Sequence, residues 1–260
     1  MTKSISVVLP AFNEEASIRG AVDAAVEALD AILDDFEVIV VDDGSSDATA
    51  RIATELVGEN PGRVRALQHR RNRGYGAAIR TGFQAGEKDL LFYTDADSQF
   101  DVKELSYFLP LIDEYDVVVG FRVYRYDSVL RSVLSWVYNR IVRILFRVRV
   151  RDVDCAFKLF RREVLDAIFI ESDDFFVDAE LVAKARRWNF RILEKGVRHY
   201  PRLAGETTVV PSNIPATLRR IAVMWRNIYM PSRRHLDEVA QLRAAVDPNV
   251  VELGQSKTAK

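Results

Sequence analysis

Two carboxylates and an amide follow an apolar run in the segment LLFYTDADSQF, residues 90–100. Asp95, Asp97 and Gln99 carry oxygen atoms, the ligands that hard divalent cations such as Mg²⁺ and Mn²⁺ prefer. In open α/β sheets, ligands bind beyond the carboxyl ends of the strands, where this segment would lie. A metal held there can clamp a diphosphate and neutralise charge on a leaving group. A solvated acidic loop after a core strand is the alternative for an isolated DxD.

The preceding elements indicate that such a strand is present. Apolar runs alternate with stretches of helical periodicity over the first 120 residues, which predicts a mostly parallel sheet covered on both faces. The runs are continuous rather than alternating, as expected for strands buried on both sides. The predicted strands are 5–9, 36–41, 64–68, 90–94 and 116–119, and the predicted helices begin near 15, 45, 74 and 102.

The second half is less regular. A long helical pattern covers 129–146, a strand is expected at 156–160, and a helix at 177–188. Short strands are expected at 190–194 and 197–200, and an amphipathic helix at 214–230. Residues 1–211 are expected to form one domain, 212–245 a C-terminal amphipathic helical extension, and 246–260 a disordered tail.

Composition limits the possible functions. The 260 residues are 48% hydrophobic and 29% charged with a net charge of −1, which gives no overall signal for binding nucleic acid. The single cysteine, Cys155, excludes an intrachain disulfide and fits a reducing compartment. Without an apolar run of 18 residues or a signal peptide, the expected location is the cytoplasm, or the cytoplasmic face of a membrane as a peripheral protein. Arginines are dense between 122 and 162, and their planar forks suit phosphate.

Polar or glycine-rich loops follow the predicted strands, and in a parallel sheet they meet at one edge. Carboxylates there can accept hydrogen bonds from ribose hydroxyls or a base edge, and glycines allow backbone to approach a phosphate. The loops are 10–14 (PAFNE), 42–45 (DDGS), 72–78 (NRGYGAA) and 95–99 (DADSQ).

These loops resemble, in order and spacing, family 2 glycosyltransferases with the GT-A fold, through VVLPAFNEE, VIVVDDGSSDAT, NRGYGAAIRTG and YTDADSQF. The later segments GFR, DVDCAFKLFRREVL, FFVDAELVAKA and HYPRLAGETT look like dolichyl-phosphate mannose and glucose synthases. The likeness covers roughly the first 210 residues. It departs at Ala156, where the family pattern often has Gly, and after Gly205, where a serine-lysine pair is usual.

The resemblance implies transfer of a hexose, with inversion, from a GDP- or UDP-sugar to a polyprenyl or dolichyl phosphate, with Mg²⁺ or Mn²⁺. It implies metal contacts by Asp95, Asp97 and Gln99, and contacts to the acceptor phosphate or the diphosphate by Arg122, Arg131 and Arg202. The residues expected at the donor are Pro10, Ala11, Asn13, Glu14, Asp42, Asp43, Gly74, Arg80, Asp95 and Ala96.

The acceptor decides whether a base is needed. A phosphate monoester is largely ionised at pH 7 and needs none, whereas a sugar hydroxyl needs a base. Asp178, with Glu180, is the candidate base for a hydroxyl; with a phosphate acceptor both would be positioning groups. A hydroxyl acceptor and a non-catalytic sugar-nucleotide-binding subunit therefore stay as alternatives. Asp152 and Asp154 are expected to order their loop against the arginines.

Overall fold

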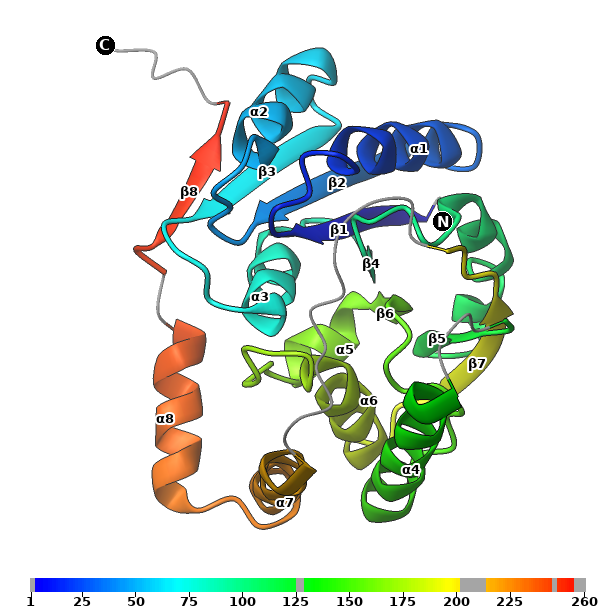
Figure 1. The fold of residues 1–260 in the computed structure, drawn as a ribbon, viewed down its shortest axis with the longest axis vertical. Coiled ribbons are helices and arrows are strands. Elements are labelled where there is room, and N and C mark those ends of the chain that lie inside the picture. Colours follow the sequence, from blue (N-terminus) through cyan, green and yellow to red (C-terminus); the bar gives the residue numbers. More distant parts are fainter. Residues whose placement is uncertain (1–2, 125–128, 202–213, 245–246, 255–260) are drawn as a thin grey trace.

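One mixed sheet forms the centre of the molecule (Figure 1). The structure, a computed structural model, describes residues 3–124, 129–201, 214–244 and 247–254. In these ranges the strand order is β7-β5-β6-β4-β1-β2-β3-β8. The strands are β1 Ser4–Ala11, β2 Asp35–Asp42, β3 Val64–His69, β4 Leu90–Thr94, β5 Val117–Arg122, β6 Phe157–Arg161, β7 Ile192–Val197 and β8 Val250–Leu253.

The predicted parallel sheet is confirmed for the first four strands. β1 pairs in parallel with β2 and with β4, and β2 with β3. β6 is inserted between β4 and β5 and runs antiparallel to both, so the sheet is mixed on this side. The central strands β1 and β4 are buried at every position, which explains their continuous apolar sequences.

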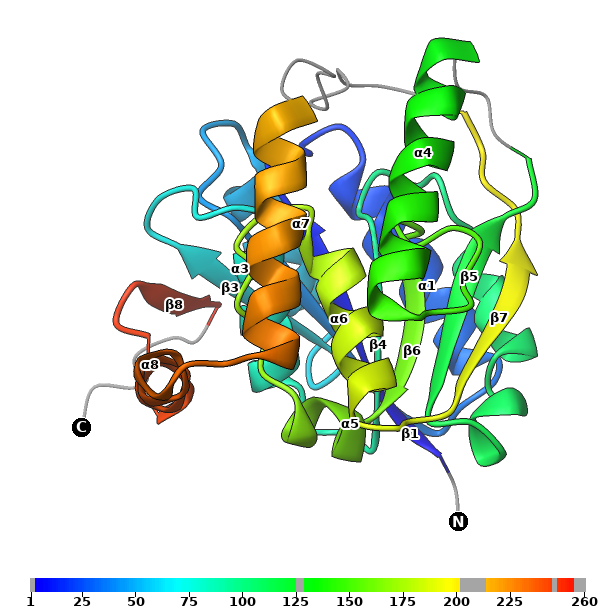
Figure 2. The ribbon, with the colours of Figure 1, turned by 90° about the horizontal axis from the view of Figure 1, so that it is seen from below.

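Helices cover both faces. α1 (Ile18–Asp30) and α2 (Thr49–Glu59) lie together on one face, and α3 (Tyr75–Ala85) packs on β1 and β2 from the other. α5 (Arg162–Ala167) and α6 (Val177–Arg187) share the face of α3, and α4 (Val129–Phe146) and α7 (Ile214–Tyr229) pack on α6 (Figure 2). α8 (Arg233–Ala244) lies beyond α7. No helix in the described ranges has the length and apolar content needed to cross a bilayer.

Two predicted elements differ in kind. The stretch 102–111 forms short 3₁₀ helices, η1 (Val102–Tyr107) and η2 (Leu111–Asp113), because Pro110 cannot donate the hydrogen bond that a continuous α-helix requires. The two short strands expected at 190–194 and 197–200 are one strand, β7, which pairs with β5 over its whole length.

The C-terminal segment belongs to the same body as the domain. Ile221, Met224 and Ile228 of α7 are buried in the common core, so the apolar stripe of this helix packs against the protein. The predicted disordered tail is wrong for β8, which pairs antiparallel with the edge strand β3 from Ala66–Leu253 to His69–Val250. The backbone of β3 provides the hydrogen-bond partners of β8, and the residues around β8 do not predict this pairing.

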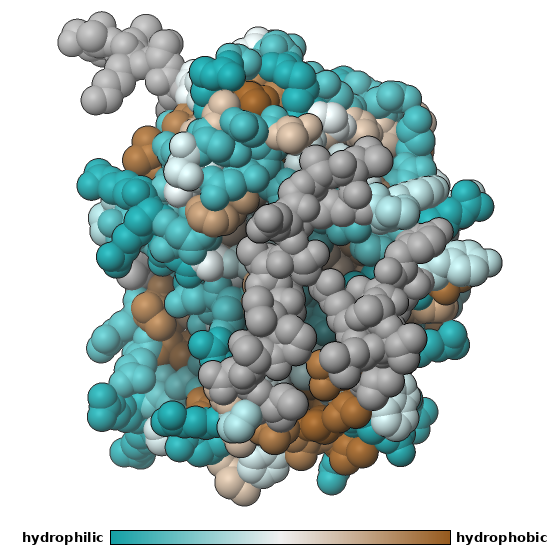
Figure 3. Space-filling model, in the orientation of Figure 1, coloured by the Kyte–Doolittle hydropathy of each residue, from teal (hydrophilic) through white to brown (hydrophobic). Residues whose placement is uncertain are grey.

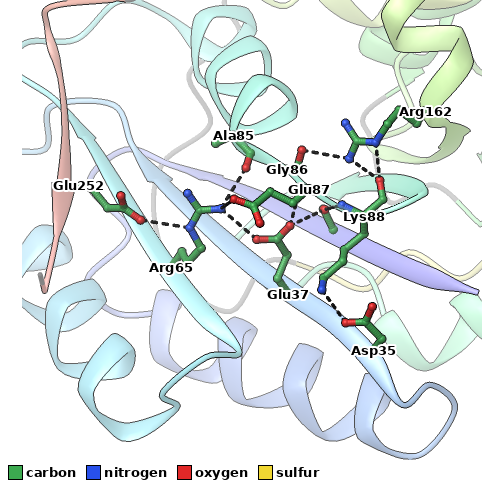
Figure 4. Close-up of polar contacts among 10 residues, drawn as sticks. Asp35, Glu37, Arg65, Ala85, Gly86, Glu87, Lys88, Arg162 and Glu252 are labelled. Atoms are coloured by element: carbon green, nitrogen blue, oxygen red, sulfur yellow. Dashed lines mark hydrogen bonds and ion pairs between the residues drawn. The ribbon is translucent and has the colours of Figure 1, made fainter.

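A polar network ties the amino ends of the strands together, away from the loops at the carboxyl edge (Figure 4). Glu37 accepts hydrogen bonds from Ser6 Oγ at 2.7 Å, from the backbone N–H of Glu87 at 2.7 Å, and from Arg65 Nη1 at 3.1 Å. Arg65 also donates to Glu252 of β8 at 3.0 Å. This edge is used for stability, which leaves the carboxyl edge for ligands.

Candidate active site at the carboxyl edge of the sheet

The register of the sheet brings the first two predicted loops together. Ala11 at the end of β1 is paired with Asp42 at the end of β2, and the backbone N–H of Asp43 donates to the carbonyl of Ala11 at 2.8 Å. Pro10 and Ala11 are buried strand residues rather than loop residues. The carboxyl end of β1 therefore lies buried between β2 and β4, below the loops at this edge.

The loop after β1 is fastened to the loop after β2. Asn13 has a φ of 56°, and its Oδ1 accepts from the backbone N–H of Ser46 at 2.9 Å. The backbone N–H of Glu14 donates to Thr49 Oγ1 at 2.9 Å. The structure thus shows Asn13 and Glu14 ordering the edge; their contact with a donor stays a prediction.

The two aspartates at the end of β2 are both buried but have different surroundings. Asp42 accepts from the backbone N–H of Ser45 at 3.1 Å and from Gln68 Nε2 at 2.8 Å. Asp43 accepts from the backbone N–H groups of Arg73 and Gly74, at 3.0 and 2.8 Å, and lies 2.6 Å from Nδ1 of the buried His69. The carboxylate of Asp43 therefore holds the turn before α3, a structural use that differs from the predicted donor contact.

The glycine-rich turn approaches protein backbone where a phosphate was expected. Gly74 has a φ of 103°, and a Cβ there would lie 2.2 Å from the carbonyl oxygen of Asp173. The backbone N–H of Gly76 donates to the same carbonyl at 2.9 Å. The glycines of this turn therefore allow close packing against the segment around Asp173 beside the start of α3. Contact of Gly74 with a donor stays a prediction. Arg80 fastens that segment by donating to the carbonyl of Ile170 at 3.2 Å and to Asp173 Oδ1 at 2.6 Å.

The predicted metal ligands lie in a tight turn after β4. Asp97 accepts from the backbone N–H of Gln99 at 3.0 Å, and Gln99 Nε2 donates to the carbonyl of Tyr200 at 2.9 Å. That bond leaves the amide oxygen of Gln99 as the atom that a cation would use. Ala96 between the carboxylates is buried and fixes the turn. His199 forms a bridge with Phe100, which brings the segment before Pro201 to this turn.

The charge of Asp97 acts on its neighbour Asp95. Burial and the charge of Asp97 raise the pKa of Asp95 to about 7, while a hydrogen bond from Tyr75 opposes that shift. A cation between two such carboxylates would relieve their repulsion. Within the described residues no three Asp, Glu, His or Cys side chains gather as a complete metal cage. The donor set nevertheless fits Mg²⁺ or Mn²⁺, which often bind through one or two carboxylates and take further oxygens from a substrate phosphate.

The arginines have different positions. Arg122 Nε and Nη2 donate to the two oxygens of Asp152 at 2.6 and 2.7 Å, and this pairing raises the pKa of Arg122. Its positive charge also lowers the pKa of Asp95. The expected ordering role of Asp152 agrees with this geometry. The side chain of Arg131 and the whole of Arg202 lie outside the described residues.

Asp178 is part of a buried polar cluster below the metal turn. Its Oδ1 pairs with Nζ of Lys158 and accepts a hydrogen bond from the hydroxyl of Tyr93. Lys158 is fully buried and also donates to Tyr93 Oη at 2.9 Å and to the carbonyl of Cys155 at 2.7 Å. These contacts hold the Asp178 carboxylate in position; a catalytic role for Asp178 stays a prediction.

Glu180 is likewise used within the fold. Its two oxygens accept from the backbone N–H groups of Glu171 and Ser172 at 2.8 Å each, and it pairs with Lys184 at 2.6 Å. The structure therefore does not bring Glu180 to the reacting edge.

Some residues of the site escaped the sequence interpretation. Tyr75 Oη donates to Asp95 Oδ1 at 2.7 Å, whereas the sequence interpretation of NRGYGAA assigned a function to its glycines and none to Tyr75. Lys158 appeared to be one more cation of the arginine-rich stretch. The carboxyl group of Asp154 also has an unusual pKa. Burial, followed by the charges of Asp178 and Asp152, raises this pKa to about 7. The sequence feature that could have predicted the buried ion pair of Lys158 is its position as a single lysine among the apolar residues of β6, FKLFR.

Residues 6–169 match the family described as "Glycosyl transferase family 2". Glycosyltransferase AglD of Haloferax volcanii is 37% identical over 216 residues, 79% of this chain and 34% of that protein. Undecaprenyl-phosphate 4-deoxy-4-formamido-L-arabinose transferase of Aeromonas hydrophila is 31% identical over 207 residues, 79% of this chain and 62% of that protein. Dolichyl-phosphate beta-glucosyltransferase of Dictyostelium discoideum is 28% identical, over 74% of this chain and 65% of that protein. The chain thus spans between about a third and two thirds of these relatives.

Solved structures support the same fold. Glucosyl-3-phosphoglycerate synthase from Mycobacterium tuberculosis, in complex with phosphoglyceric acid, superposes with a TM-score of 0.64 at 22% identity, over 87% of this chain and 80% of that one. S. aureus TarS 1-349 in complex with UDP-GlcNAc gives a TM-score of 0.56 at 22% identity, over 91% of this chain and 70% of that one. With more than half of its residues matching the family and its sheet matching these structures, the chain belongs to glycosyl transferase family 2 and has the GT-A fold.

Proposed function

We propose that this chain transfers a hexose, mannose or glucose, from a GDP- or UDP-sugar to a polyprenyl or dolichyl phosphate. The observation that carries the proposal is the pair of carboxylates, Asp95 and Asp97, after β4 at the carboxyl edge of the sheet, with Asp42 at the same edge on the other side of β1. The names of the relatives from Aeromonas hydrophila and Dictyostelium discoideum, which include undecaprenyl phosphate and dolichyl phosphate, support the acceptor class.

Asp95, Asp97 and Gln99 would hold Mg²⁺ or Mn²⁺. When bound there, the ion supplies Lewis-acid stabilisation of the departing nucleoside diphosphate. Solved neighbours at 22% and 19% identity carry Mn²⁺ with UDP, or Mg²⁺ with UDP, which agrees with this choice. The protein's own contribution is to keep both carboxylates in place, through the hydrogen bonds from Tyr75 and from the backbone of Gln99.

The surroundings of Asp178 and Glu180 favour a phosphate acceptor over a hydroxyl. Both candidate bases are ion-paired with buried lysines, Lys158 and Lys184, so neither is poised to take a proton from a hydroxyl. A phosphate monoester needs no such base, because it is already largely ionised at pH 7. It can attack the anomeric carbon in line as the nucleoside diphosphate leaves from the opposite side.

Arginine provides the remaining charge in this proposal. Arg122 is fixed by Asp152 within electrostatic reach of Asp95, and Arg131 and Arg202 would contact the acceptor phosphate or the diphosphate. Arg131→Ala is expected to raise the KM for polyprenyl phosphate far more than the KM for the donor. The opposite pattern would place Arg131 at the donor.

Donor binding tests the metal assignment without turnover. Equilibrium dialysis should show Mn²⁺-dependent binding of the nucleoside diphosphate, UDP or GDP, by the native chain. Asp97→Ala should lose the metal-dependent part, whereas Asp113→Ala, at an exposed position after β4 and away from the site, should keep it. An Mn²⁺-dependent increase in binding that is as large in Asp97→Ala as in the native chain would reject the assignment.

A further inference from the structure

The outer face of α4 carries large apolar side chains that the protein does not cover. The exposed fractions are 67% for Trp136, 41% for Val137 and 61% for Ile144. Their spacing places them on one side of the helix, opposite the buried residues Val142 and Phe146. An amphipathic helix in a water-facing position would show polar residues there, so this face is unusual.

α7 packs next to α4 and carries exposed apolar side chains of its own. α4 and α7 are in contact, since Tyr229 Oη donates to the carbonyl of Phe146 at 3.1 Å. Val223 of α7 is 41% exposed and Met230, directly after this helix, is 66% exposed, whereas the apolar stripe on the other side of α7 is buried. We define the α4–α7 face as the exposed residues Trp136, Val137, Arg140, Ile144, Val223, Arg226 and Met230.

The charge of these two helices has one sign. The sequences of α4 and α7 together contain six arginines and neither aspartate nor glutamate. Arg140 lies between the exposed apolar residues of α4, and Arg226 lies between Val223 and Met230 in the sequence. Apolar side chains mixed with arginines, without acidic residues, match the interface of a bilayer that contains anionic lipid.

The position of the face relates it to the active site. α4 and α7 run side by side along the sheet, and both begin at the end of the molecule where the carboxyl ends of the strands lie (Figure 2). Seen from that end, apolar surface appears where α4 and α7 come together (Figure 3). Within this face, Trp136 and Val137 lie nearer to that end, whereas Ile144 and Met230 lie at the far ends of the two helices.

We propose that the α4–α7 face docks the protein on a bilayer surface containing anionic phospholipid. The proposal deepens the proposed function and rests on it for its purpose, since a polyprenyl phosphate is embedded in such a bilayer. Trp136 and Ile144 enter the level of the headgroups, and Arg140 and Arg226 contact lipid phosphates. A second copy meeting the same face across a two-fold axis would set arginines against arginines, which disfavours a dimer here.

Vesicle flotation of the full chain tests the docking. The protein should float with phosphatidylcholine vesicles containing phosphatidylglycerol, should not float with phosphatidylcholine alone, and should be released by salt. Arg140→Glu combined with Arg226→Glu should reduce binding roughly tenfold or more, because each arginine near an anionic surface contributes substantially. Trp136→Glu combined with Ile144→Glu should also abolish flotation.

Matched controls lie elsewhere on the surface. Arg51→Glu on α2 and Leu242→Glu on α8 change residues that are 66% and 58% exposed, respectively, and should leave flotation unchanged. Circular dichroism melting curves check that each variant folds. Absence of flotation by the native chain, or equal loss in the controls, overturns the proposal. So does concentration-dependent self-association that Trp136→Glu with Ile144→Glu breaks, because it assigns the face to a second copy.

Transfer to a short, water-soluble isoprenyl phosphate separates the two claims. The docking variants should retain it, since they leave the site intact. A chain that floats but transfers to no phosphate keeps the docking surface and rejects the proposed function. A chain that transfers the sugar but does not float keeps the proposed function and rejects the docking surface.

Discussion

The hydroxyl of Tyr75 donates a 2.7 Å hydrogen bond to Oδ1 of Asp95, joining the first residue of α3 to the metal turn after β4. The ring of Tyr75 stacks on Phe175 with 5.2 Å between ring centroids. The stacking and the hydrogen bond together fix the position of the Tyr75 hydroxyl. A carboxylate that repels its neighbour Asp97 is thereby held in one orientation. Such supporting partners typically contribute ten- to a hundredfold to metal affinity.

Tyr75→Phe should therefore weaken Mn²⁺ binding by about tenfold while changing the stability by less than about 1 kcal/mol, because the ring and its stacking remain. Titration of Mn²⁺ in the presence of a nucleoside diphosphate measures the first quantity and urea unfolding the second. Tyr107→Phe, at an exposed position away from the turn, is the control. Unchanged Mn²⁺ affinity in Tyr75→Phe would show that Asp95 needs no support.

Gly76→Ala should destabilise the protein through a collision. A Cβ at this position would lie 2.3 Å from the carbonyl oxygen of Ser172, which is backbone and cannot move alone. The expected loss in the free energy of unfolding is about 1–3 kcal/mol. Gly20→Ala is the matched control, since a Cβ there has open space in α1, and alanine should be neutral or stabilising. A stable Gly76→Ala variant would mean that the 172–174 segment does not pack on this turn.

Asp178→Asn should act mainly on stability. It leaves Lys158 buried without a carboxylate, and breaking a buried pair typically costs about 3–5 kcal/mol. The double change Lys158→Met with Asp178→Asn should recover a large part of that loss. Chemical denaturation of the native chain, both single variants and the double variant gives the coupling free energy. A fully stable Asp178→Asn that has lost turnover would instead make Asp178 a catalytic base.

The pH dependence of stability should carry a contribution from Asp154. Its pKa in the folded chain is about 7, above the usual value of 3.8, so the fold favours the protonated acid. The charged form becomes costly as pH rises from about 4 to 7, and the native chain should lose stability relative to Asp154→Asn across that window. The expected difference is roughly 3 kcal/mol, from about 1.4 kcal/mol for each pH unit of the shift. A difference that is flat between pH 4 and 7 would contradict the burial of this carboxyl group.

The sequence predicted the parts of the fold that depend on local pattern. The strands β1 to β4 and the helices between them follow from continuous apolar runs and helical spacing, and so does the position of the loops after these strands at one edge of the sheet. The segment that forms β8 was predicted as part of a disordered tail because the chain is polar after about residue 245 and ends GQSKTAK. Its structure comes from the open edge of β3, a partner about 180 residues earlier in the chain.

The candidate site shows the same division. The positions of Asp95 and Asp97 after a buried strand follow from the sequence alone. The close packing of Gly74 depends on the segment around Asp173, and the ion pair of Asp178 depends on Lys158 of β6. These contacts join residues that are distant in sequence, so residue type and spacing could not distinguish a phosphate cradle from close packing, or a base from a buried ion pair.

The most direct test compares acceptors that differ only in the phosphate. The native chain should be incubated with GDP- and UDP-hexoses, Mg²⁺ or Mn²⁺, and either a polyprenyl phosphate or the corresponding polyprenol. We predict metal-dependent transfer to the polyprenyl phosphate and none to the polyprenol. Transfer to polyprenol or another hydroxyl at an equal or higher rate, or binding of the donor without any transfer, would contradict this account.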